Sequence, residues 1–154
     1  MNLRVNANAI VTNSEGKFLL IKLKRGPFAG GLCIPGGGIY PGELSHDAAR
    51  REVFEETGIF VESDFKPFGF CELRSDKVKQ HKIVMLLHAE AEGSPKNTEE
   101  GEAEWYSYEE AEPNLILFAK EAIIIWKNNE AHFRLVDEDV DIRDYSQQTS
   151  QQEK

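Results

Sequence analysis

Glu52, Glu55 and Glu56 are spaced so that a helix through them would carry all three carboxylates on one face. At about 100° per residue they fall within an arc roughly 100° wide. Like charges at this spacing destabilise a helix by roughly 0.2–0.5 kcal/mol per pair. The other residues on the arc are small and uncharged, so nothing on it neutralises the glutamates. A divalent cation such as Mg²⁺ prefers carboxylate oxygens and would remove the repulsion.

The segment before the glutamates has the composition of a binding loop that leads into a helix. The stretch 34–38, Ile-Pro-Gly-Gly-Gly, reads as a strand end followed by a glycine loop. Pro41 and Gly42 predict a second turn, and Glu43 then opens the helix, where its charge suits the helix dipole. Gly58 predicts the end of the helix. An acidic surface helix would explain three glutamates alone, but it does not explain this arrangement around them.

The residues from Gly37 to Ile59 follow the pattern G-x5-E-x7-R-E-V-x-E-E-x-G-I, which resembles the signature of the Nudix hydrolases and of MutT-like members in particular. The resemblance does not assign a subfamily. It implies hydrolysis of the diphosphate linkage in a nucleoside diphosphate joined to another group, of the nucleoside triphosphate or nucleotide-sugar type. It also implies Mg²⁺ or Mn²⁺ bound by the helix carboxylates and by a carbonyl of the preceding loop.

The resemblance gives the candidate residues their roles. Glu43 and Arg51 would support and orient the helix carboxylates, since an Arg guanidinium can hold a carboxylate in one rotamer. The general base remains open, because related enzymes differ in that choice. The candidate metal ligands are Gly36, Gly37, Glu52, Glu55 and Glu56, and the candidate catalytic residues in this segment are Glu43, Arg51, Glu52, Glu55 and Glu56.

An acidic loop before Trp105 supplies two further candidates. Glu99 and Glu102 lie six and three residues before Trp105, where family members often place a supplementary carboxylate that binds metal or acts as base. A solvated acidic loop is an equally good interpretation of the composition.

Three residues are candidates for substrate binding. Phe28, on a Gly-rich loop, could stack on a nucleobase, although simple packing explains it equally well. Arg74 and His81 lie near a predicted hairpin tip and could meet phosphates, although a solvated turn is the simpler explanation.

Length and composition favour one soluble domain. The 154 residues suffice for one core, predicted to occupy 1–145, with a Ser/Gln-rich disordered tail at 146–154. A net charge of −9 argues against a nucleic-acid partner, and no apolar run is long enough to cross a membrane. Cys33 and Cys71 fit buried thiols in a reducing cytoplasm. We expect a monomer or a homodimer.

The expected elements indicate an α/β fold, a Nudix-type α/β/α sandwich with a mixed β-sheet. Helices are predicted at 43–57 and 114–129, with a brief turn at 108–111. Strands are predicted at 3–12, 17–24, 32–34, 60–61, 65–73, 82–91 and 104–108.

Three functions compete at this point. The first is a metal-dependent pyrophosphohydrolase acting on a small nucleotide. The second is a Nudix-fold module that binds a nucleotide without cleaving it, but such a module would be expected to lose helix carboxylates, and all three are present. The third is isomerase or nucleic-acid-processing chemistry, which usually needs further domains or a basic face. The first function is therefore favoured.

Overall fold

The computed structural model describes residues 1–77 and 79–136. Two of its helices are long, α1 (Ser45–Thr57) and α3 (Leu117–Lys127), and between them in the chain lie the single turn α2 (Tyr108–Ala111) and the 3₁₀ turn η1 (Glu112–Asn114). The strands are β1 (Leu3–Thr12), β2 (Phe18–Leu23), β3 (Leu32–Cys33), β4 (Gly36–Gly38), β5 (Lys66–Ser75), β6 (Gln80–Glu90), β7 (Gly101–Tyr106) and β8 (His132–Val136).

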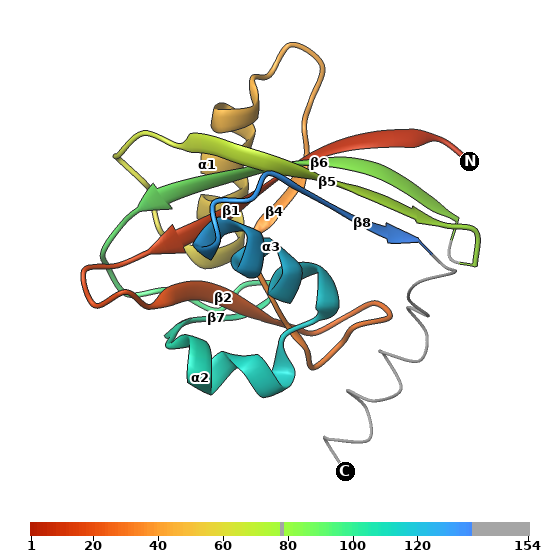
Figure 1. Cartoon of the computed structure of the whole chain (residues 1–154). Coiled ribbons are helices and arrows are strands. Elements are labelled where there is room, and N and C mark those ends of the chain that lie inside the picture. The colour runs from red at the N-terminus through yellow and green to blue at the C-terminus, as the bar shows by residue number, and fades with distance from the viewer. Residues whose placement is uncertain (78, 137–154) are drawn as a thin grey trace.

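Strand β1 is the centre of a mixed sheet (Figure 1). It runs parallel to β6 over its whole length and pairs antiparallel with β2 and with the short strand β4. The main path of the sheet is β3-β2-β1-β6-β5-β8, and β7 pairs with β2. The pairing of β1 with β4 is the part that matters for the site, because β4 is the glycine loop itself.

The helices pack on opposite faces of the sheet and form two cores. On one face, Ala48, Ala49 and Val53 of α1 pack on alternate residues of β1, including Ala7 and Ala9. A larger cluster on the other face joins α3 to Ile10 of β1 and to apolar residues of β2, β5 and β6. Figure 1 shows α1 behind the sheet and α3 in front of it. The expected α/β sandwich with a mixed sheet is confirmed.

The boundaries differ from the predicted ones in places. Helix α1 begins at Ser45 and not at Glu43, because the Glu43 N–H bonds to the Tyr40 carbonyl in a turn. It ends at Gly58 with a left-handed φ of 77°, as predicted.

Three other segments also depart from the prediction. Residues 60–61 lie outside any strand, and the last long helix begins only at Leu117, after the η1 turn. Strand β8 was not predicted at all. The predicted tail 146–154 lies outside the described residues.

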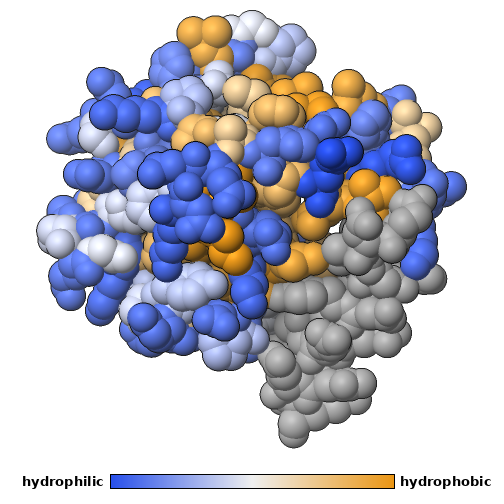
Figure 2. Space-filling model, in the orientation of Figure 1, coloured by the Kyte–Doolittle hydropathy of each residue, from blue (hydrophilic) through white to orange (hydrophobic). Residues whose placement is uncertain are grey.

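Apolar residues interrupt a largely hydrophilic surface on the face drawn in Figure 2. Among the large apolar side chains, Leu3, Val5, Phe60 and Phe70 are exposed. Within residues 1–77 and 79–136, none of the helices has the length and apolar character needed to cross a membrane.

Candidate active site

Gly37 lies directly against the carboxylate of Glu52. A Cβ built on Gly37 would be 2.6 Å from Glu52 Oε1, which is closer than a real Cβ approaches an oxygen. The carboxylate therefore occupies the space that a side chain at Gly37 would take. Pairing of Gly37 with Ala7 fixes the loop backbone in this position. Burial is the main cause that raises the pKa of Glu52, although Arg51 acts in the opposite direction.

Glu56 reaches the same loop one residue earlier. Its Oε1 accepts a hydrogen bond from the Gly36 N–H at 2.7 Å. Burial, followed by the charges of Glu52 and other carboxylates, raises its pKa to about 8 despite that hydrogen bond. The Glu56 side chain therefore faces the protein, which excludes the interpretation of α1 as an ordinary solvated acidic helix.

Arg51 joins the helix to its own entry loop. Its Nε and Nη2 donate to the two oxygens of Glu43 at 2.9 and 3.0 Å, and Nη2 also donates to the Gly38 carbonyl at 2.9 Å. These bonds lower the pKa of Glu43 and raise that of Arg51. The guanidinium also lies 3.9 Å from the centre of the Tyr40 ring.

The same guanidinium reaches the helix carboxylates, which corrects one expectation. Arg51 Nη1 lies 2.9 Å from Glu52 Oε1 and 3.5 Å from Glu55 Oε2. The expectation that nothing neutralises the glutamate face was wrong for these two residues, because the long Arg51 side chain crosses from a neighbouring helix position. Glu56 does not share this cation: the causes that shift its pKa include three carboxylates and no basic group.

The loop between β6 and β7 brings a fourth glutamate towards the cluster. Thr98 Oγ1 donates to the Glu56 carbonyl at 3.1 Å, and the Lys96 N–H donates to the Thr57 carbonyl at 2.8 Å. These bonds attach the loop to the end of α1. Glu100 then lies close enough that its charge raises the pKa of both Glu52 and Glu56.

The two loop residues predicted from the sequence lie differently. Glu99 and Glu102 are exposed, as Glu100 is, and Glu102 lies on β7 opposite Lys22 of β2. Glu102 acts electrostatically on Tyr106, and neither residue is among the causes of the pKa shifts of Glu52 and Glu56. The spacing before Trp105 predicted the right loop, but the glutamate of this loop whose charge acts on Glu52 and Glu56 is Glu100.

A model of the NUDIX domain family matches residues 2–126, which include the glycine loop, α1 and the Glu100 loop. The chain belongs to the Nudix family. The nucleoside triphosphatase NudI of Salmonella agona is 43% identical over 60 residues, which are 37% of this chain and 43% of that protein. The ADP-ribose pyrophosphatase of Methanocaldococcus jannaschii is 43% identical over 49 residues, 32% of this chain and 29% of that protein. The chain thus spans less than half the length of these two relatives.

The crystal structure of a MutT NUDIX hydrolase from Burkholderia pseudomallei is similar to most of this chain. It superposes with a TM-score of 0.72 at 26% sequence identity, over 80% of this chain and 98% of that one.

Nudix hydrolases generally use a divalent metal ion, and the residues of this Nudix site fit one. The side chains are carboxylates beside a glycine loop, the donor set that hard cations prefer. Burial and then the neighbouring carboxylates raise the pKa of Glu56, and burial raises that of Glu52, so a cation bound here would favour their charged forms. Among the described residues, no three acidic, His or Cys side chains are gathered as a ready metal site. Arg51 holds Glu52 and Glu55, whereas Glu56 is held by the loop.

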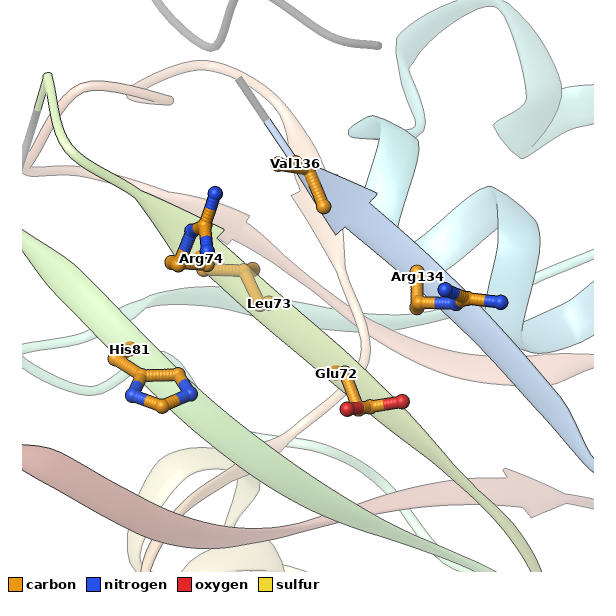
Figure 3. A pocket seen from close by; sticks show the side chains of 6 residues that line it. All are labelled: Glu72, Leu73, Arg74, His81, Arg134 and Val136. Atoms are coloured by element: carbon orange, nitrogen blue, oxygen red, sulfur yellow. The ribbon is translucent and has the colours of Figure 1, made fainter. Parts of the chain in front are cut away.

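The three residues predicted to bind substrate lie apart from the Nudix helix. Phe28 is partly buried and packs against the α3 core. Arg74 and His81 are register partners on β5 and β6 and line a hollow of about 230 Å³ with Arg134 of β8 (Figure 3). His81 is the register partner of Leu3 on β1. Leu3 lies three residues before Asn6, the β1 residue opposite Gly38 of the loop, and three strand residues span roughly 10 Å.

Two residues of the Nudix site were missed by sequence reasoning. Tyr40 could have been suggested by its place three residues before Glu43, since an aromatic ring in a turn is a natural partner for Arg51. Glu100 had no such signal, because it lies among Glu99, Glu102 and Glu104 in one acidic stretch.

Proposed function

We propose that this protein hydrolyses the diphosphate linkage of a small nucleotide, a nucleoside diphosphate joined to a phosphate or to a sugar-type group. One observation carries the proposal: the carboxylates of Glu52 and Glu56 meet the glycine loop at Gly37 and Gly36. The relatives named as a nucleoside triphosphatase and an ADP-ribose pyrophosphatase support the same reaction class.

The divalent cation would be held by Glu52, Glu55 and Glu56 together with a backbone carbonyl of Gly36 or Gly37, and Mg²⁺ or Mn²⁺ suits oxygen donors. When bound, such an ion polarises phosphoryl oxygens and lowers the pKa of bound water. Arg51, held by Glu43 and by the Gly38 carbonyl, would orient Glu52 and Glu55, whereas the Gly36 N–H holds Glu56.

In the reaction, a water oxygen forms a bond to one phosphorus and the bridging P–O bond breaks. The bonding electron pair leaves with the second phosphate, and a carboxylate accepts the proton of the water. Glu56 is our candidate for this part, because the Gly36 N–H fixes its carboxylate at the loop. Glu100, whose charge acts on Glu52 and Glu56, is proposed as the supplementary carboxylate of the loop in place of Glu99 or Glu102.

The test is a phosphate-release screen with Mg²⁺ and with Mn²⁺ over nucleoside triphosphates, nucleotide sugars, ADP-ribose and dinucleotide polyphosphates. We expect turnover of at least one class, its loss in a chelator and its recovery when the metal is restored. Glu56→Gln provides the control for a contaminating hydrolase and should be inactive. Tight nucleotide binding without turnover by the wild type would instead support a binding module.

A further inference from the structure

The loop between β6 and β7 covers the end of α1, where the last backbone carbonyls have no partner within a helix. Two of these carbonyls are bonded by the loop instead. The Lys96 N–H donates to the Thr57 carbonyl at 2.8 Å. One residue earlier in the helix, Thr98 Oγ1 donates to the Glu56 carbonyl at 3.1 Å. The loop is therefore the cap of the helix that carries the candidate metal ligands.

The hydroxyl of Thr98 makes a second hydrogen bond, to the loop glutamate. Its oxygen accepts from the Glu100 N–H at 3.2 Å, while its proton goes to the Glu56 carbonyl. A hydroxyl can do both, since it has one donor and two acceptor lone pairs. A single side-chain atom therefore joins the backbone of Glu56 to the backbone of Glu100.

Lys24, the first residue after β2, holds the same stretch of loop from the sheet. Its Nζ donates to the Thr98 carbonyl at 3.0 Å, and its N–H donates to the Glu100 carbonyl at 3.3 Å. The Thr98 N–H bonds to the carbonyl of Gly101 at 2.9 Å, where β7 begins. Both backbone groups of Glu100 are thus bonded, and its side chain is exposed.

A helix cap alone would not need this arrangement. Any backbone donor can satisfy a carbonyl of the last turn, as the Lys96 N–H does for Thr57. The bond from the Glu100 N–H to Thr98 adds nothing to the helix, but it fixes the backbone from which the Glu100 carboxylate extends. The charge of that carboxylate reaches the helix, since it is one of the causes that raise the pKa of Glu56.

We propose that Thr98 is a positioning residue, which holds Glu100 at a set place relative to Glu56 before a metal ion binds. The inference rests on the proposed function, in which Glu100 is the supplementary carboxylate of the loop. Without the hydroxyl, Glu100 would be ordered only when the ion binds. Ordering the backbone of one residue changes an equilibrium constant by about tenfold. Thr98 thus acts on the metal site without contacting the ion.

Three variants separate positioning from capping. Thr98→Val removes the hydroxyl and keeps the branched shape of the side chain, whereas Thr98→Ser keeps the hydroxyl. Ser107→Ala is the matched control, because Ser107 Oγ also accepts from a backbone N–H, that of Glu110 at 3.2 Å, but at the start of α2. It should lower Tm, as the loss of a cap does, without changing the position of Glu100.

The first measurement is the NMR order parameter of the Glu100 N–H in the metal-free protein. We expect about 0.8 or more in the wild type, Thr98→Ser and Ser107→Ala, as for rigid backbone, and less than about 0.6 in Thr98→Val. Gly58, whose N–H bonds to the Phe54 carbonyl, should stay rigid in every variant. A flexible Glu100 in the wild type, a rigid one in Thr98→Val, or equal loosening of Gly58 and Glu100 would overturn the proposal.

The second measurement is Mn²⁺ binding without nucleotide, followed by the electron paramagnetic resonance of the free ion. Thr98→Val should weaken binding about tenfold, whereas Thr98→Ser and Ser107→Ala should stay within about threefold of the wild type. In a Glu100→Gln protein, Thr98→Val should cause no further loss, because the hydroxyl then has no carboxylate to position. Equal weakening with and without Glu100 would show that Thr98 acts through the helix end, which contradicts the proposal, as would a wild type that binds no Mn²⁺.

Turnover distinguishes the failure of this inference from the failure of the proposed function. At Mn²⁺ concentrations below the wild-type Kd, Thr98→Val should lower turnover about tenfold, and Thr98→Ser should restore it. A wild type that hydrolyses no substrate would refute the proposed function, while the order parameters and Mn²⁺ binding would still decide the role of Thr98. An active wild type matched by Thr98→Val in all three measurements would refute the positioning role alone.

Discussion

The backbone N–H of Gly36 donates to Glu56 Oε1 across 2.7 Å, which fixes a partly buried carboxylate of the Nudix helix against the glycine loop. This bond favours the charged form of Glu56, yet burial and the neighbouring carboxylates outweigh it and raise the pKa to about 8. Glu56 is thus held in position while its charge is poorly compensated. Both properties can be tested in the metal-free protein.

The stability of the metal-free protein should depend on the pH through Glu56. Its pKa is about 8 in the folded protein against a reference value of 4.5, so the folded state binds more protons between these values. The free energy of unfolding therefore falls as the pH rises through this window. Glu56→Gln should remove the loss and gain on the order of 1 kcal/mol at the upper end, or about 2–4 °C in Tm. Thermal unfolding in EDTA across the window checks this, and parallel curves for the two proteins would contradict it.

Replacing Gly37 by alanine should lower turnover much more than the same change at its neighbour Gly38. Gly37→Ala places a Cβ 2.6 Å from Glu52 Oε1 and must displace that carboxylate, whereas a Cβ on Gly38 meets only Asn6 Oδ1 at 4.0 Å. We expect kcat to fall by at least about tenfold for Gly37→Ala and by less than about twofold for Gly38→Ala. Steady-state kinetics with circular dichroism as a fold check decide the matter. Equal loss in both variants would mean that loop flexibility, and not the space for Glu52, is what matters.

Glu55→Gln and Glu56→Gln should each lose at least about 10² in turnover, because each removes a carboxylate that binds metal or accepts a proton. The fold should persist, since both changes relieve repulsion between like charges on α1. Turnover on the best substrate and far-ultraviolet circular dichroism are the measurements. Near wild-type rates in two folded variants would place the active site elsewhere.

Arg51→Lys should separate charge from geometry. Lysine keeps the positive charge but loses the paired hydrogen bonds to Glu43 and the bond to the Gly38 carbonyl. We expect turnover to fall by about tenfold or more. Arg50→Lys is the control, since Arg50 donates instead to the carbonyls of Val61 and Ser63. It should lower Tm without a comparable loss of turnover. An Arg51→Lys enzyme with wild-type kinetics would show that charge alone suffices.

The acidic loop can be tested with three neighbouring substitutions at saturating metal. Glu100 is the loop residue whose charge acts on Glu52 and Glu56, so Glu100→Gln should lower kcat by about 10² if it accepts a proton or binds metal. The sequence-based prediction instead places this role at Glu99 or Glu102. A fall in kcat for Glu99→Gln or Glu102→Gln alone would favour that prediction, and three unaffected variants would make the loop a solvated surface.

The local pattern of the chain was sufficient to predict α1, its end at Gly58 and the shared face of the three glutamates. Each of these depends on residues within a few turns of one another. Strand β8 was missed because its pairing partner, β5, lies far away in the chain, and its five residues include only one that is buried. Glu100 was missed for a similar reason: the bonds that orient its loop go from Lys96 and Thr98 to the end of α1.

The contacts of Arg51 with Glu52 and Glu55 could not be predicted for a different reason. Helical spacing describes where side chains leave the backbone, and on that basis Arg51 lies off the glutamate arc. Its length lets the guanidinium return to Glu52 and Glu55 while also holding Glu43. Long flexible cations therefore have to be considered beyond the face on which they start.

The position of β1 between β4 and β6 has a consequence for folding errors. One edge of β1 sets Gly38 opposite Asn6, and the other sets Lys82 opposite Arg4. A slip of β1 by a single residue would turn each of its side chains to the other face of the sheet. The glycine loop opposite Asn6 and the residues of β6 opposite β1 would then lose their alignment in one step. A misregistered molecule could keep most of its secondary structure and still be wholly inert, so in this protein activity reports correct strand pairing more sharply than circular dichroism does.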